Sequence, residues 1–68
     1  EIQITVFTSR AERIFDLVKD TALELEVFQN GRDTIIDIYY TLGFFETEVD
    51  EIVQALDAAN YDYDVNDI

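Results

Sequence analysis

The sequence predicts a single α+β domain, spanning residues 1–68, whose strands and helices follow the order βαββαβ. Three observations support this fold class. The first and last segments alternate apolar and polar residues, as half-buried strands do. Two further alternating segments flank Asn30-Gly31, a pair typical of tight hairpin turns. Between these strands, two segments repeat apolar residues at helical spacing.

The first strand is predicted at Glu1–Thr8, which alternates between two faces. Ser9 and Glu12 follow it in the Ser-x-x-Glu spacing of a capping box, so we expect the first helix to begin there. The apolar residues that mark the inner side of this helix are Ala11, Ile14, Phe15 and Val18, with Leu17 beside them.

A hairpin is predicted from Ala22–Gln29 and Arg32–Tyr39, joined by a two-residue type I′ turn at Asn30-Gly31. This loop pairs Glu24 directly with Asp37, and like charges so placed destabilise a sheet. The register that this loop sets gives the hairpin one apolar face and one face of mixed polarity. The mixed face carries Glu24, Glu26, Phe28, Asp33, Ile35 and Asp37.

The second helix is expected to follow Gly43, with Thr47 as its N-cap. Acids crowd its first turns, where the helix dipole favours negative charge. Asn60 can end it in a left-handed conformation, and Tyr61–Val65 then alternates as a short last strand. The apolar residues of this helix are Val49, Ile52, Val53, Leu56 and Ala59.

The element order βαββαβ is the ferredoxin-like arrangement of two split βαβ units. We therefore expect an antiparallel sheet of order 4-1-3-2, with two helices on one face and the other face open. A βαββα variant remains as the alternative if the last strand does not form.

The net charge of −12 comes from sixteen acids against four bases, and it is unevenly distributed. Residues 1–34 hold seven acids and all four bases, whereas residues 35–68 hold nine acids and no base. A chain with so few bases lacks the basic surface that binds nucleic acid or an anionic membrane directly. Its 49% hydrophobic content argues against a disordered acidic tail.

The absence of cysteine excludes a disulfide framework and a thiolate zinc site. It fits a reducing compartment, so we expect a cytoplasmic protein, in the host cytoplasm if a phage encodes it. No apolar segment approaches the roughly 18 residues of a membrane span, and no signal-peptide pattern is present. Because the chain starts at Glu1 and contains no methionine, we expect its initiating residues to have been trimmed or to be missing from the sequence.

Catalytic groups are scarce, since the chain has no histidine or cysteine and a single serine, Ser9, which capping would occupy. We therefore expect a protein that is not an enzyme and has no cofactor. Asp62, Asp64 and Asn66 have the 1-3-5 spacing of a calcium loop, but Asp67 stands where that loop needs glycine. An alternating edge strand explains this segment better, and we predict no metal site.

Two surfaces are candidates for binding a partner. On the open face of the sheet the candidate residues are Glu24, Glu26, Phe28, Asp37, Tyr39, Asp62 and Asp64. On the second helix they are Glu46, Glu48, Asp50, Glu51 and Asp57. The plainer alternative is that aromatic residues cover the sheet while the acids are solvated. That alternative explains poorly why no base follows Arg32, because a surface of one sign costs self-repulsion.

The function predicted from these features is a non-enzymatic inhibitor or decoy that occupies the basic surface of a nucleic-acid-binding protein. In size, charge and lack of catalytic groups the chain is similar to the DNA-mimic inhibitors that phages encode against nucleases, repair proteins and defence proteins. One alternative is a small ACT-like regulatory domain, although such domains have a glycine-containing loop where this chain has Thr8-Ser9-Arg10. Another is a structural subunit that assembles through sheet edges. A homodimer through the open face is possible, but it would bring acids together.

Overall fold

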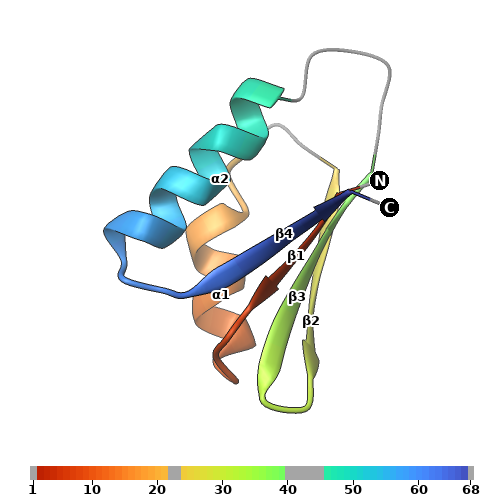
Figure 1. The fold of residues 1–68 in the computed structure, drawn as a ribbon, viewed down its shortest axis with the longest axis vertical. Helices are drawn as coiled ribbons and strands as arrows, with labels where there is room; N and C mark the ends of the chain where they lie inside the picture. The colour runs from red at the N-terminus through yellow and green to blue at the C-terminus, as the bar shows by residue number, and fades with distance from the viewer. Residues whose placement is uncertain (1, 22–23, 40–45, 68) are drawn as a thin grey trace.

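The computed structural model describes residues 2–21, 24–39 and 46–67, with the side chains of residues 46–48 outside that description (Figure 1). Its elements have the predicted order βαββαβ, and the α+β class is confirmed. They are β1 (Ile2–Val6), α1 (Ala11–Val18), β2 (Leu25–Asn30), β3 (Asp33–Ile38), α2 (Glu46–Ala58) and β4 (Tyr63–Asp67).

The four strands form one antiparallel sheet of order β2-β3-β1-β4, which is the predicted order counted from the opposite edge. Both helices lie on the same side of the sheet, as Figure 1 shows. The last strand forms, two residues later than expected, so the βαββα variant is excluded. β3 and β1 are the interior strands, and β2 and β4 are the edges.

The hairpin register differs from the prediction by two residues. Asn30 pairs with Asp33, so the two loop residues are Gly31 and Arg32 instead of Asn30 and Gly31. Gly31 takes a positive φ of 64° at the first loop position, where a type II′ turn requires glycine. Because side chains alternate with period two, a shift of two residues leaves every side chain on its predicted face. The shift does change the pairing, and Glu26, not Glu24, lies opposite Asp37.

The core lies between the sheet and the helices. Central positions on β1 and β3 and the inner stripes of α1 and α2 are closed to solvent. Thr34 is the buried polar residue among those described, and its Oγ1 donates a hydrogen bond to the Thr8 carbonyl oxygen at 2.8 Å. The buried apolar residues of this core are Ile4, Val6, Ile14, Val18, Ile36, Ile38, Val49, Ile52 and Leu56.

The beginning of α1 corrects the predicted capping box. The N-cap is Arg10, no side chain caps the helix, and the Arg10 amide donates to Thr8 Oγ1 at 3.3 Å. Ser9 therefore lies one residue too early to act as the cap. Phe15 is 48% exposed, against its predicted place in the core, because the buried stripe of this two-turn helix is narrow and centres on Ile14 and Val18.

The end of α2 agrees with its prediction. Asn60 has a φ of 62°, and its amide donates to the Asp57 carbonyl while the Tyr61 amide donates to that of Leu56. These two bonds form a Schellman motif, and Tyr61 packs against the core beyond it. At the other end the N-cap prediction is wrong, because Thr47 lies inside the helix. Gly43 lies outside the described residues.

Candidate interaction surface

The side of the sheet away from the helices carries alternate residues of all four strands. We call it the sheet face and define it by Gln3, Thr5, Phe7, Glu26, Phe28, Ile35, Asp37, Tyr39, Asp64 and Asn66. No described helix or strand covers it (Figure 1). Glu24 and Asp62 extend it at two ends, since their carbonyl oxygens accept backbone hydrogen bonds from Tyr39 and Phe7.

On the half of the sheet face formed by β2 and β3, two carboxylates lie opposite each other, Glu26 on β2 and Asp37 on β3. Each accepts a hydrogen bond from a neighbouring side chain. The Tyr39 hydroxyl donates to Glu26 Oε2 at 3.0 Å, and Gln3 Nε2 donates to Asp37 Oδ1 at 2.9 Å. These bonds hold both carboxylates in place without neutralising them. Among the described residues the one ion pair is elsewhere, between Lys19 and Asp16 at 3.5 Å.

Apolar groups flank this charged pair. Phe7, Phe28 and Tyr39 are 51%, 42% and 38% exposed, which is high for aromatic side chains. Ile35 is only 5% exposed, although it lies on the sheet face and outside the core cluster. Its partners in the register are Phe28 and Thr5. Side chains of the face itself therefore shield Ile35, which gives the surface a packed apolar centre.

The acids of the β4 edge form a second, outer group on the same side. Asp62 and Asp64 are exposed, and Asp64 lies opposite Thr5 on β1. One strand thus separates these acids from the strand that carries Asp37. The structure brings all seven sheet residues predicted from the sequence to one side of the sheet, with β1 separating the group at β2 and β3 from the group at β4.

The acids of α2 belong to a different surface, because the helix lies on the other side of the sheet (Figure 1). Asp50, Glu51 and Asp57 are exposed. At about 100° per residue, Asp50 and Asp57 share one stripe of the helix and Glu51 points elsewhere. Glu46 and Glu48 lie in α2, but their side chains are outside the described residues. One flat partner surface cannot contact both the sheet face and this helix.

Asp57 also ties α2 to the edge strand. The Tyr63 hydroxyl donates a hydrogen bond to Asp57 Oδ1 at 2.9 Å. This bond, with smaller contributions from desolvation and from the negative charge of Asp57, raises the pKa of Tyr63 above its ordinary value of 10.0. The pKa of Tyr63 therefore reports on the contact between α2 and β4.

Replacing Asp57 with asparagine is expected to move the pKa of Tyr63 back toward 10.0, because the hydrogen bond to a carboxylate is lost and, with it, the smaller effect of the negative charge. A pKa that is higher in the folded chain means that the bond stabilises the fold fully below pH 10.0 and ceases to do so as pH rises through the folded-state pKa. NMR titration of the Tyr63 ring measures this pKa in the wild-type chain and in the Asp57→Asn variant. The Asp50→Asn variant, on the same helical stripe, should leave the titration unchanged. An unaltered Tyr63 titration in Asp57→Asn contradicts the assignment.

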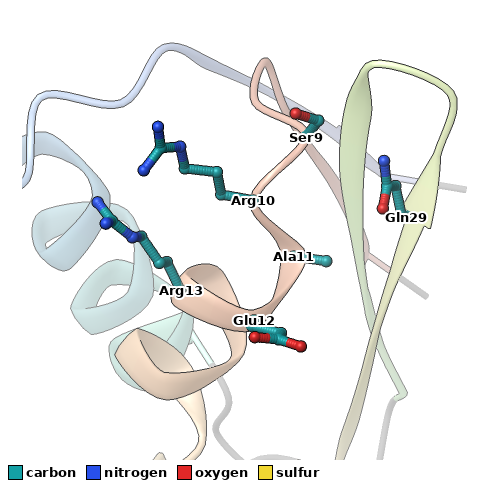
Figure 2. Close-up of a pocket in the computed structure, with 6 residues that line it drawn as sticks. All are labelled: Ser9, Arg10, Ala11, Glu12, Arg13 and Gln29. Carbon is teal, nitrogen blue, oxygen red and sulfur yellow. The ribbon is translucent and has the colours of Figure 1, made fainter.

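A shallow hollow of about 350 Å³ lies beside the start of α1. Figure 2 shows that Arg10 and Arg13 extend to one side of the helix, away from Gln29, so its polar groups do not converge. Within the described residues no hydrogen bond joins the Ser9 hydroxyl to a base, and such a bond is what activates a serine nucleophile.

The calcium-like spacing near the C-terminal end forms no loop. β4 includes Asp64, Asn66 and Asp67 as strand residues, in agreement with the edge-strand interpretation. In the part of the chain that the structure describes, no three acidic side chains gather closely enough to hold a metal ion.

Comparison of the chain with protein-family models, with curated proteins and with solved structures returned no match. None of the described helices is long and apolar enough to cross a membrane.

Sequence reasoning missed the part that Gln3 plays. Strand alternation puts Gln3 on the sheet face, but its bond to Asp37 depends on the pairing of β1 with β3. These strands are far apart in the sequence, and no turn sets their register. The signal that could have found this contact is the predicted strand order, which makes β1 and β3 neighbours.

Proposed function

We propose that this protein is a non-enzymatic decoy whose sheet face occupies the basic surface of a nucleic-acid-binding protein. The observation that supports the proposal most directly is the Glu26–Asp37 pair, two carboxylates opposed on adjacent strands, each held by a side-chain hydrogen bond. We also assign the domain to the ferredoxin-like arrangement, on the basis of its element order and its strand order.

The spacing of the pair suits a phosphate substitute. Residues directly opposite in an antiparallel sheet have Cβ atoms about 5 Å apart. Each strand of duplex DNA carries one charge per roughly 3.4 Å of helix axis, so both surfaces hold negative charges in close succession. Among the described acids of α2, Asp50 and Asp57 share one stripe but lie about 10 Å apart along the helix, and Glu51 points elsewhere. The sheet face is therefore the better candidate surface.

The repulsion between the two carboxylates also favours a cationic partner. Like charges directly opposite in a sheet destabilise it by several tenths of a kcal/mol, up to about 1 kcal/mol. An Arg or Lys from a partner relieves that repulsion and adds charge-assisted hydrogen bonds. Two copies of this chain docking through the sheet face would instead bring Glu26 and Asp37 of each copy against one another. This repulsion makes a homodimer through the sheet face the weaker candidate.

Partner binding is expected to weaken at least about tenfold as NaCl rises from about 0.05 M to about 1 M, because the screening length falls from more than about 10 Å to about 3 Å. Partners are captured from a lysate with the immobilised protein and eluted with short duplex DNA. This elution selects basic proteins whose nucleic-acid site was occupied by the immobilised chain. Each eluted protein is then purified, and its DNA binding is titrated with this chain.

A partner that loses DNA binding on adding one equivalent of the chain supports the proposal. Two results contradict it: capture that persists at about 1 M NaCl, where screening is nearly complete, and captured proteins that duplex DNA does not displace.

A further inference from the structure

The sheet face combines its carboxylates with aromatic rings in a particular order. Along β2, Glu26 and Phe28 are two residues apart, and the same spacing separates Asp37 on β3 from Tyr39, which follows the strand and whose amide donates to the Glu24 carbonyl oxygen. Residues two apart on a strand project to the same side at about 6.7 Å. Phe28 therefore lies at one end of the carboxylate pair and Tyr39 at the other, and both rings are partly exposed.

We infer that the partner side chains received by this face are arginines in preference to lysines, an inference that rests on the proposed function. A guanidinium group is planar, weakly hydrated and able to stack on an aromatic ring. Its donors also match a carboxylate in a bidentate fashion. Glu26 and Asp37 offer such carboxylates beside the Phe28 ring and the apolar Ile35.

Lysine fits the same place less well, although its charge is identical. Its ammonium group is a compact and strongly hydrated charge, which loses water when placed over Phe28 and Ile35. A carboxylate has about four acceptor positions, so the bonds from Tyr39 and Gln3 leave room for two guanidinium donors. The preference for arginine over lysine thus comes from the aromatic rings and the fixed carboxylates. Net charge alone cannot produce it, because the two side chains carry the same charge.

The test uses two synthetic peptides of equal length and charge, one with arginine and the other with lysine at every basic position. Calorimetric titration of the full chain at low salt is expected to give an affinity for the arginine peptide about tenfold higher, which is the scale of a cation–π contact. NMR amide shifts should change at Glu26, Phe28 and Asp37. The Phe28→Ala variant should bring the two affinities to within about twofold by weakening arginine binding alone.

Phe15 supplies the matched control, since it is a phenylalanine of similar exposure on α1, away from the sheet face. Phe15→Ala should keep the preference for arginine, and the circular dichroism spectra of both variants show whether they are folded. If the wild-type chain binds the two peptides with equal affinity, and salt weakens both, the arginine inference is contradicted and the proposed function still stands. A preference that survives Phe28→Ala also contradicts the inference. Failure of both peptides to bind contradicts the proposed function itself.

Discussion

Replacing Ile36 with alanine is expected to leave much of the protein unfolded at physiological temperature. Ile36 is closed to solvent at the centre of β3, where it pairs with Ile4 on one side and Val27 on the other. Truncating a buried isoleucine to alanine costs about 2–5 kcal/mol. A chain of 68 residues has a total stability of only about 3–10 kcal/mol. This single cavity therefore removes a large share of the free energy of unfolding.

Urea titration followed by circular dichroism measures the effect. Val65→Ala is the matched control, because Val65 is an apolar residue of edge strand β4 that is 46% exposed. Its truncation should cost less than about 1 kcal/mol. If the two variants lose similar stability, the centre of the core does not lie at β3.

The local features of the chain were the most predictable from the sequence. Asn60 ends α2 in the left-handed region as expected, because this motif depends only on neighbouring backbone groups. The predicted N-caps were less successful. At the start of α1, the bond from the Arg10 amide to Thr8 Oγ1 lies before the helix, and no side chain caps the helix itself. The Ser-x-x-Glu spacing marks a place where a cap can form, and it does not fix the residue at which the helix begins.

The hairpin shows which part of a sheet prediction is robust. Asn30-Gly31 allowed two placements of a two-residue loop, and the structure uses the one that gives Gly31 the first position. Both placements sort the side chains onto the same faces, so the members of the sheet face were predictable. The individual contacts were not. The pair formed by Glu26 and Asp37 depends on the turn, and the bond from Gln3 depends on long-range packing.

The pattern of exposure also separates two kinds of aromatic residue. Phe15 was expected inside and is exposed, because α1 spans only two turns and buries a narrow stripe. Phe28 was expected on the open face and lies there, because strand alternation is strict. Helical periodicity defines an inner side about 100° wide, and residues at its margins depend on neighbouring elements that the sequence does not place.

Replacing Glu26 with glutamine and Asp37 with asparagine together is expected to stabilise the fold while weakening its binding to the arginine peptide. The amide oxygens can still accept the bonds from Tyr39 and Gln3, so the positions of the side chains are kept. Removing the like-charge pair should raise the free energy of unfolding by up to about 1 kcal/mol at low salt. Losing two charge-assisted bonds should lower the affinity at least about tenfold.

The double variant Asp50→Asn, Glu51→Gln is the control, since it removes the same two charges from exposed positions on α2. It changes the long-range field equally, and it should alter the affinity for the arginine peptide much less. Urea titration and calorimetry on the same samples give both quantities. If the acids of the sheet face served only the fold, their replacement would lower stability and leave binding at the level of the α2 control. If the surface serves a cationic partner, the double replacement raises the free energy of unfolding and lowers the affinity. The two quantities change in opposite directions because the carboxylates repel each other in the free protein, and a bound cation relieves that repulsion.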